Sequence, residues 1–355
     1  MHPTPNLSEL NRITGRLFMA GMPGLYMDAG TEELIRDYCL GGIILFSRNI
    51  ENPLQIAGLC KDLQDTAMKH HGTPLFIAVD QEGGRVARLK RPFTSFPGNE
   101  AIGADLSPID RAVEFADITA RELKLVGLNM DMAPVIDVRR GEIERHLVGR
   151  TFSDDPDKVS QLGRTVVTVL QQNGVMAVGK HFPGLGRATM DPHHLLPVIE
   201  ADLREIEEIN LPPFKEVISS GVSGIMTSHA IYPSLDPEFP ATLSTKILNG
   251  ILREKLGFQG MIITDDLEMG AINKNCGVVK GAVDSFMAGA DILLISENQD
   301  LVLESMAELR ERLLRNEIQL TRLNQSIKRI MTAKSKFIQK VGEVSFERIK
   351  VHFAL

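Results

Sequence analysis

Residues 156–181 read PDKVSQLGRTVVTVLQQNGVMAVGKH and contain one complete helix–strand unit. The first part, 156–173, predicts an amphipathic helix: Pro156 begins it, where a missing N–H costs least, and Gly174 follows it, where helices often stop. The last part, 177–181, is a short apolar run that predicts a buried strand. A helix followed closely by such a strand is typical of parallel sheets.

The same alternation runs through most of the chain. Eight predicted strands cover residues 16–20, 42–46, 75–80, 129–135, 177–181, 224–228, 260–264 and 291–295. Helical patterns between them cover residues 31–40, 53–69, 108–126, 156–173, 203–220, 244–256 and 279–288. Eight such units fit a closed (β/α)8 barrel better than open sheets, and the doubly wound alternative lacks a G-x-G-x-x-G turn because residues 19–24 read MAGMPG. We therefore predict an α/β fold of the TIM-barrel type.

Two further helical patterns, 301–314 and 320–340, follow the last predicted strand and precede a short tail. We expect residues 1–300 to form the barrel and residues 301–355 to pack on it as C-terminal helices, not as a separate domain. The second pattern is rich in lysine and arginine. This indicates a solvated outer face rather than a surface for an anionic partner.

The composition argues against several classes of protein. The 355 residues carry a net charge of −7 without a block of like charge, which disfavours nucleic acid or an anionic membrane as a partner. No run of about eighteen apolar residues occurs, and the start of the chain lacks the pattern of a secretory signal. The three cysteines have no metal-ligand or redox spacing. We expect a cytoplasmic monomer, and the absence of tryptophan favours a small polar substrate.

Ionisable residues gather where the predicted strands end. Asp80 ends the third strand, and Lys180 and His181 end the fifth. Asp265 and Asp266 follow the seventh. In a (β/α)8 barrel these strand ends form one face, on which active sites lie. Each residue has an alternative interpretation, a helix cap for the aspartates or a core position for the histidine, but a purely structural barrel does not need so many charges on one face.

The segment 184–197 has no helix or strand pattern and contains Asp191, Pro192, His193 and His194. A histidine two residues after an aspartate can share a hydrogen bond with it, which would hold the ring, fix its tautomer and raise its pKa. His193 would then be a proton donor usable near neutral pH, on a loop able to move over the site. The alternatives are a surface loop with stray histidines and a metal site, but no H-E-x-x-H arrangement is present.

Six sequence segments occur in a fixed order over about residues 16 to 300. They are VDQEGGRV at 79–86, KHFPG at 180–184 with Gly186, DxH at 191–193, SHAIYP at 228–233, PATLS at 240–244 and ITDDLEMGA at 263–271. Together they resemble the signature of glycoside hydrolase family 3, in its β-N-acetylhexosaminidase branch. The order of the matches makes this resemblance much more specific than any single motif.

The resemblance implies roles for individual residues. Asp265 matches the catalytic nucleophile, His193 the acid/base and Asp191 its orienting partner. The positions that match residues binding the N-acetylglucosamine unit are Asp80, Arg88, Arg150, Lys180 and His181. One-domain members of this branch release N-acetylglucosamine from N-acetylglucosaminyl-1,6-anhydromuramoyl fragments in peptidoglycan recycling. The resemblance thus implies a muropeptide substrate, with no metal and no organic cofactor.

Three places depart from the common family sequence. Leu185 stands where the family often has histidine, and Arg187 stands where it often has aspartate. The region 139–147 is also unlike the common sequence, so Arg150 matches less closely than the other sugar-binding positions. These departures concern loop motion and contacts with the leaving group, not the reaction.

The implied reaction is a retaining double displacement, in which Asp265 attacks the anomeric carbon while His193 protonates the departing oxygen. Because the nucleophile must stay ionised, we expect it to have cationic neighbours that include Lys180 or Arg88.

Phosphorolysis is the closest alternative, since a neutral histidine does not repel a phosphate dianion. A β-glucosidase of the same family and an inactive barrel that binds wall fragments fit the 184–197 loop less well. A nucleotide-binding oxidoreductase lacks its glycine fingerprint.

Overall fold

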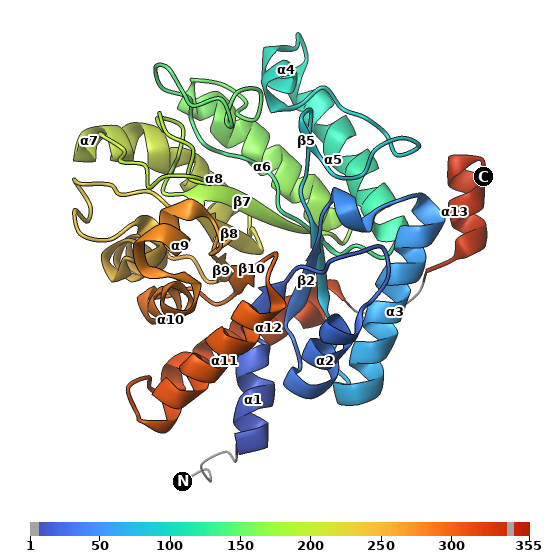
Figure 1. Ribbon diagram of the computed structural model, residues 1–355. Helices are drawn as coiled ribbons and strands as arrows, with labels where there is room; N and C mark the ends of the chain where they lie inside the picture. Colours follow the sequence, from blue (N-terminus) through green and yellow to red (C-terminus); the bar gives the residue numbers. More distant parts are fainter. Residues whose placement is uncertain (1–6, 339–343) are drawn as a thin grey trace.

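Parallel strands form a barrel at the centre of the molecule (Figure 1). The computed structural model describes residues 7–338 and 344–355. The barrel strands are β1 (Phe18–Ala20), β2 (Gly42–Leu45), β3 (Phe76–Val79), β6 (Met130–Asp131), β7 (Met176–Phe182), β8 (Gly224–Thr227), β9 (Met261–Ile263) and β10 (Leu293–Ile295). They pair in parallel in the order β10-β1-β2-β3-β6-β7-β8-β9. A parallel bridge between Ile263 and Ile292 joins the two ends, which confirms the predicted (β/α)8 barrel.

Helices surround the barrel and connect its strands (Figure 1). The main connecting helices are α2 (Ala29–Tyr38), α3 (Pro53–His71), α5 (Pro108–Leu125), α6 (Pro156–Gln172), α8 (Leu211–Ser219) and α10 (Val278–Ala288). Shorter helices and turns are α1 (Leu7–Gly15), η1 (Ser47–Asn49), α4 (Asn99–Ala104), α7 (Leu203–Glu205), η3 (Ala241–Leu243) and α9 (Gly270–Cys276). The C-terminal part contains α11 (Gln299–Leu314), α12 (Leu320–Phe337) and α13 (Phe346–Phe353).

Local sequence explains why α6 begins and α3 ends where they do. The Asp155 carboxylate accepts a hydrogen bond from the N–H of Asp157 at 2.9 Å, and Pro156 occupies the first helical position. These contacts satisfy or remove N–H groups that the first turn of a helix leaves unpaired. The helix α3 ends at Gly72, whose φ of 65° is unstrained only without a β-carbon.

Several elements differ from the predicted pattern. The predicted strand 129–135 is regular only over β6, because Pro134 cannot donate a ladder hydrogen bond. The predicted helix 203–220 is divided into α7, the π-helical turn η2 (Ile206–Asn210) and α8, next to Pro212 and Pro213, which lack the N–H of a regular turn. The predicted helix 244–256 is the π-helix η4 (Lys246–Lys255), and nothing in its local sequence explains the wider turn.

Several elements were not predicted: the short helices α1, α4 and α9, the turns η1 and η3, a small hairpin and the helix α13. A small hairpin, β4 (Gln81–Gly83) and β5 (Val86–Ala87), follows β3. The helix α13 occupies part of the expected tail, and its end packs against the barrel through the rings of Phe93 and Phe353, whose centroids are 4.7 Å apart. Such a short helix is marginal alone, so its stability depends on this packing. The last two residues of the predicted helix 320–340 lie outside the described residues.

The helix α12 packs against the amino-terminal ends of the strands. Nη1 of Arg329 lies 3.1 Å from Oδ1 of Asp291, just before β10. Nζ of Lys334 lies 4.8 Å from the ring centroid of Phe76, the first residue of β3. The opposite, carboxyl-terminal end of the barrel is therefore left open to carry the site. None of the helices in residues 7–338 and 344–355 combines the length and apolar composition needed to cross a membrane.

Candidate active site

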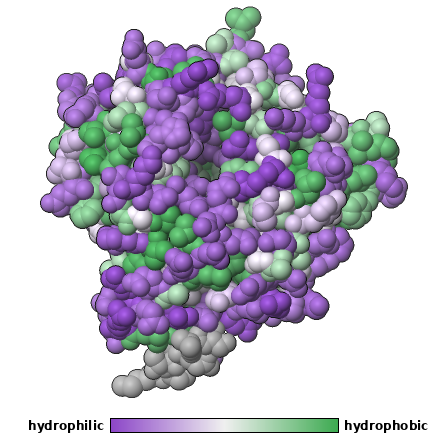
Figure 2. Space-filling model, in the orientation of Figure 1, coloured by the Kyte–Doolittle hydropathy of each residue, from purple (hydrophilic) through white to green (hydrophobic). Residues whose placement is uncertain are grey.

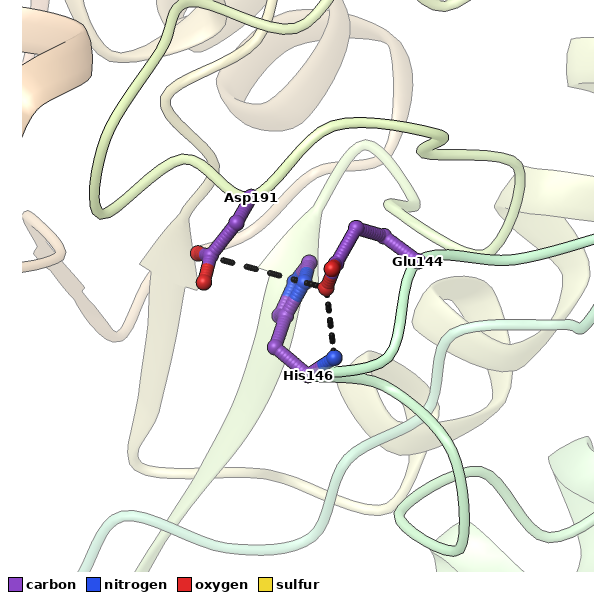
Figure 3. Close-up of side chains that lie close together, drawn as sticks. All are labelled: Glu144, His146 and Asp191. Carbon is purple, nitrogen blue, oxygen red and sulfur yellow. Dashed lines mark hydrogen bonds and ion pairs between the residues drawn. The ribbon is translucent and has the colours of Figure 1, made fainter.

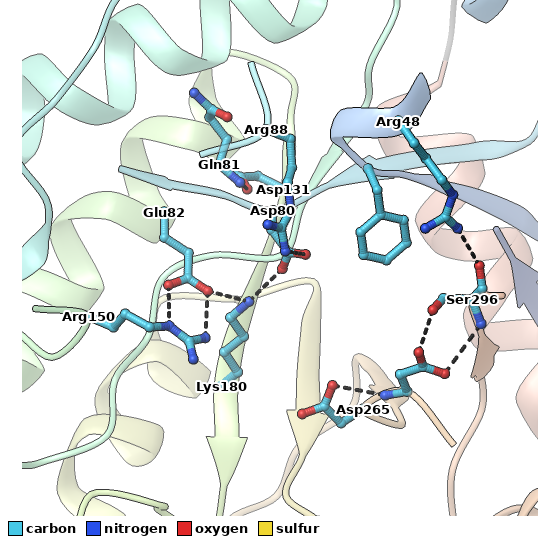
Figure 4. A network of polar contacts seen from close by, with 12 residues as sticks. Arg48, Asp80, Gln81, Glu82, Arg88, Asp131, Arg150, Lys180, Asp265 and Ser296 are labelled. Atoms are coloured by element: carbon cyan, nitrogen blue, oxygen red, sulfur yellow. Dashed lines mark hydrogen bonds and ion pairs between the residues drawn. The ribbon is translucent and has the colours of Figure 1, made fainter. Parts of the chain in front are cut away.

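Four of the five predicted sugar-binding residues, Asp80, Arg88, Arg150 and Lys180, belong to one charged cluster at the carboxyl ends of the strands (Figure 4). Nζ of Lys180, in β7, lies 2.8 Å from Oδ1 of Asp80 and 2.7 Å from Oε1 of Glu82. Nη2 of Arg88 lies 3.3 Å from the other oxygen of Asp80. Asp80 follows β3 and Glu82 lies in the adjoining hairpin, so this connection brings both carboxylates to the end of β7.

Glu82 holds the cluster together, although it was not among the predicted site residues. Its carboxylate accepts hydrogen bonds from Nε and Nη2 of Arg150, both at 2.8 Å, in addition to the contact with Lys180. Burial favours the neutral acid, but the two cations outweigh it, so the pKa of Glu82 lies well below its ordinary value. Its position two residues after Asp80, within the VDQEGGRV segment, was the signal that could have identified it.

Asp137, on the connection after β6, holds His181 in one orientation. Oδ2 of Asp137 lies 2.7 Å from Nδ1 of His181, and Oδ1 accepts hydrogen bonds from the backbone N–H groups of His181 and Leu185 at 3.1 and 2.7 Å. Because a carboxylate accepts hydrogen bonds, Nδ1 of the ring carries a proton. This arrangement leaves Nε2 of His181 as the atom able to meet a ligand.

Asp265 lies two residues after the end of β9 and is half-buried. Burial alone would raise its pKa, but the charges of His181, His229 and Lys180 outweigh burial. The backbone N–H of Asp266 also donates to Oδ1 of Asp265 at 2.9 Å. The pKa of Asp265 therefore lies below its ordinary value, and the carboxylate stays ionised near neutral pH.

Of the two cations expected near Asp265, Lys180 and Arg88, only Lys180 is among the groups that lower its pKa. Lys180 acts on Asp265 as expected. The ion pair of Arg88 is instead with Asp80, because both lie on the connection that follows β3. The two imidazoles of His181 and His229 were not anticipated as neighbours of the nucleophile position.

His229, after β8, is a buried imidazole whose pKa responds to both predicted catalytic residues. Its Nδ1 bonds with Oγ1 of Thr242 at 2.7 Å. Its pKa lies below the ordinary value, chiefly because the ring is buried. Asp265 acts to raise this pKa, whereas His181 and His193 act to lower it further. His229 is thus close enough to feel the charges of both Asp265 and His193.

Asp266 has a structural role beside Asp265. Its Oδ1 accepts hydrogen bonds from the backbone N–H groups of Glu268 at 3.1 Å and Ser296 at 3.3 Å. Burial raises the pKa of Asp266 to about 6. The helix-cap alternative is wrong for Asp266, because the N-cap residue of α9 is Met269; Asp266 instead joins its own turn to the residue after β10. The Asp265 carboxylate accepts only the neighbouring N–H among the contacts described.

Asp191 and His193 form the expected hydrogen-bonded pair. Oδ1 of Asp191 lies 2.6 Å from Nδ1 of His193 and accepts the backbone N–H of His193 at 2.9 Å. Burial would raise the pKa of Asp191, but these hydrogen bonds outweigh it and the pKa is lowered. The His193 side chain is 56% exposed. With Nδ1 engaged, Nε2 of His193 is the nitrogen free to exchange a proton with a ligand.

Residues 184–197, here called the catalytic loop, are fastened on both sides. On one side the N–H groups of Gly270 and Ala271 donate to the carbonyls of His193 and Pro192 at 3.0 and 3.1 Å. On the other side, two backbone bonds join the loop to the connection after β6: Arg140 N–H to Gly186 O at 2.9 Å and Glu144 N–H to Ala188 O at 2.8 Å. The loop is thereby docked between the β6–α6 and β9–α9 connections.

The residues that depart from the family sequence have defined contacts. Leu185 is 2% exposed, and its N–H binds Asp137. Arg187 pairs with Glu205 of α7, with Nε 2.9 Å from Oε1. Both residues therefore help to hold the catalytic loop in place.

One group in the described part of the chain offers three potential metal ligands. Atoms of Glu144, His146 and Asp191 lie within 4.8 Å of one another (Figure 3). All three are already engaged, because Glu144 binds His146 and Asp191 binds His193. The contacts thus describe two hydrogen-bonded carboxylate–histidine pairs rather than an open set of ligands.

The molecular face in Figure 2 has a hollow near its middle with a largely hydrophilic rim. This agrees with a site that presents charged groups to a polar molecule. In the charged cluster of Figure 4, carboxylates supply acceptors, and lysine and arginine supply donors.

Comparisons with known proteins assign this arrangement to a family. The profile of the glycosyl hydrolase family 3 N-terminal domain matches residues 8–333. The chain belongs to glycosyl hydrolase family 3. This family membership confirms the resemblance seen in the sequence, and the protein is a glycoside hydrolase of the β-hexosaminidase type.

Individual members of family 3 support this assignment. The chain is 38% identical to a β-hexosaminidase of Nitrosomonas eutropha, covering 76% of this chain and 77% of that protein. It is 36% identical to β-hexosaminidase A of Pseudoalteromonas piscicida, covering 91% of this chain but only 59% of that longer protein. The solved β-N-acetylglucosaminidase from Paenibacillus sp. FPU-7 superposes with a TM-score of 0.90 at 35% identity, covering 98% of this chain and 68% of that one.

Proposed function

We propose that this family 3 protein is a retaining β-N-acetylhexosaminidase, with Asp265 as nucleophile and His193 as acid/base. The main observation behind the proposal is that two suitable groups lie at the same end of the barrel. Asp265 is kept ionised by imidazole and ammonium neighbours, and His193 has its Nδ1 engaged by Asp191 on the adjoining loop. A carboxylate nucleophile and a separate proton donor are what a double displacement requires.

The first step forms a bond between a carboxylate oxygen of Asp265 and the anomeric carbon, while the bond to the leaving oxygen breaks. Nε2 of His193 gives its proton to that oxygen. In the second step water attacks the anomeric carbon, Nε2 of His193 takes the proton from water, and the Asp265 carboxylate departs. Two inversions at the same carbon restore the β configuration.

The charged cluster supports recognition of the sugar. Asp80 accepts hydrogen bonds from hydroxyl groups, Arg88 and Lys180 donate them, and Nε2 is the ring nitrogen of His181 that can meet the sugar. Nε and Nη2 of Arg150 are bound to Glu82, so Arg150 acts mainly by fixing the carboxylate that holds Lys180.

We further propose N-acetylglucosaminyl-1,6-anhydromuropeptides as substrates and the cytoplasm as the place of action. The match of the active-site motifs to the peptidoglycan-recycling members of the family supports the substrate. The three cysteines are free thiols, which is common in a reducing compartment.

The test is mass analysis of products from an anhydromuropeptide and from chitobiose, with and without inorganic phosphate. We expect free N-acetylglucosamine in both buffers, and Asp265→Ala should lower its formation by about three or more orders of magnitude while the fold persists. Sugar 1-phosphate as the main product in phosphate would select phosphorolysis instead. Near-normal turnover by the Asp265→Ala variant would exclude Asp265 as the nucleophile.

A further inference from the structure

The β6–α6 connection carries a second carboxylate–histidine pair, Glu144 and His146 (Figure 3). Oε2 of Glu144 accepts a hydrogen bond from the backbone N–H of His146 at 2.5 Å and lies 2.6 Å from its Nδ1. Asp191 makes the corresponding two contacts with His193, at 2.9 and 2.6 Å. Both pairs therefore have the same two-residue spacing and the same hydrogen-bond pattern, on neighbouring loops.

The two pairs lie against each other. Nδ1 of His146 is 3.9 Å from Oδ1 of Asp191. The rings of His146 and His193 meet edge to face, with centroids 6.2 Å apart and planes at 79°. His146 thus contacts both members of the acid/base pair from an element outside the catalytic loop.

His146 also contacts the sugar-binding cluster through its backbone. Its carbonyl oxygen accepts a hydrogen bond from Nη1 of Arg150 at 3.4 Å. The remaining donors of that guanidinium bind Glu82, which binds Lys180 in turn. A continuous series of contacts therefore runs from Lys180 in the sugar-binding cluster to Asp191, which orients the acid/base.

The charge state of His146 suits a role in positioning. The side chain is 9% exposed, and burial lowers the pKa of its imidazole. Its Nε2 is buried without a hydrogen-bond partner in the part of the chain that the structure describes. A neutral ring that donates Nδ1–H to Glu144 fits both observations. A neutral ring, unlike a cation, does not attract the Asp191 carboxylate away from His193.

We propose that His146 is a positioning residue that fixes the Asp191–His193 pair relative to the sugar-binding cluster. The inference rests on the proposed function, because it assumes that His193 delivers the proton. Without the His146 ring, Asp191 loses a rigid neighbour and the imidazole of His193 samples more orientations. Proton transfer to a leaving group then becomes slower, while contacts with the sugar remain.

The test compares two substrates that differ in their need for a proton. Chitobiose has a poor leaving group, which must be protonated as it departs. The 4-nitrophenolate of 4-nitrophenyl N-acetyl-β-glucosaminide departs readily without a proton. For His146→Ala we expect kcat on chitobiose to fall about tenfold or more, kcat on the aryl substrate to change less than about threefold, and KM to change little. Leu147→Ala is the matched control, because Leu147 is buried in the same loop and its hydrogen bond to the carbonyl of Glu144, at 3.0 Å, comes from the backbone N–H, which alanine keeps. Leu147→Ala should lower thermal stability, but it should not lower kcat on chitobiose more than kcat on the aryl substrate.

His193→Ala is measured alongside as the reference. If His193→Ala lacks the selective loss on chitobiose, the proposed function fails. If His193→Ala has it and His146→Ala does not, only the present inference fails. The same selectivity in Leu147→Ala would also overturn it, since a general disturbance of the loop would then suffice. Should His146→Ala not fold, Glu144→Gln replaces it: a loss confined to chitobiose supports the inference, and equal losses on both substrates contradict it.

Discussion

Glu82 accepts hydrogen bonds from Arg150 and contacts Lys180 while its side chain is only 1% exposed. A buried carboxylate of this kind is stable only with both cations, and each cation is stable only with the carboxylate. The local charges around Asp80 and Lys180 are therefore interdependent. Single side chains of the site contribute to stability as well as to binding.

Replacing Glu82 tests this interdependence. Glu82→Gln should lower the free energy of unfolding by about 3 kcal/mol, because it leaves Arg150 without its paired carboxylate and Lys180 with Asp80 alone. It should also raise KM, because Lys180 loses one of its two anchors. Urea unfolding and steady-state kinetics measure the two effects.

The control is Glu297→Gln, which removes an exposed partner of Arg48. The Glu297 side chain is 61% exposed, so its loss should change the free energy of unfolding by less than about 1 kcal/mol. Equal destabilisation by the two variants would contradict the argument that burial makes Glu82 important.

At the scale of elements, the start of α9 docks the catalytic loop. Gly270 lies on the connection that follows β9, and its N–H binds the carbonyl of His193. A β-carbon on Gly270 would lie 2.8 Å from that carbonyl oxygen and 2.7 Å from the carbonyl oxygen of His194. The absence of a side chain here lets two neighbouring connections approach closely enough to bring Asp265 and His193 to one site.

Gly270→Ala should push the catalytic loop away from α9. We expect kcat on chitobiose to fall by about tenfold or more, since small displacements of a proton donor are costly, with a smaller loss on the aryl substrate. Gly58→Ala is the control, because Gly58 lies in α3 with no atom near its missing β-carbon. It should keep full activity and gain up to about 1 kcal/mol in stability. Unchanged chitobiose turnover in Gly270→Ala would show that the close approach is not required.

At the scale of the whole molecule, the C-terminal segment closes the end of the barrel opposite the site. Lys334 of α12 is 1% exposed, with its ammonium over the ring of Phe76 and no hydrogen bond or ion pair within the described residues. Burial, with a smaller effect from Arg16, lowers the pKa of Lys334 to about 7. We propose that residues 301–355 fold together with the barrel, and this buried lysine offers a way to measure it.

Lys334→Met should stabilise the protein, most strongly at low pH. The folded-state pKa of about 7 lies below the ordinary 10.5, so the cost of burying the ammonium is full below pH 7 and disappears as pH rises to 10.5. We expect a gain of about 4 kcal/mol in urea unfolding at pH 6 and little gain at pH 10. Lys328→Met, at an exposed position of the same helix, should change stability by less than about 0.5 kcal/mol. A pH-independent gain would contradict the assigned charge state.

The order of elements followed from local patterns. Apolar runs, helix-start prolines and helix-end glycines predicted all eight strands and the barrel, because these signals act within a few residues. The motifs also placed Asp80, Lys180 and Asp265 at strand ends that a barrel gathers on one face. The hydrogen-bonded Asp191–His193 pair was predictable because its two members are only two residues apart.

Contacts between distant segments were not predictable in this way. Glu82 meets Arg150, and Asp137 meets His181, only because the closed barrel sets the connections after β3 and β6 beside each other and beside β7. The contact of His146 with Asp191 and the docking of His193 on Gly270 depend on loop packing for the same reason. Chemical identity and periodicity along the chain are local properties, whereas burial, charge pairing and pKa depend on which segments fold against each other.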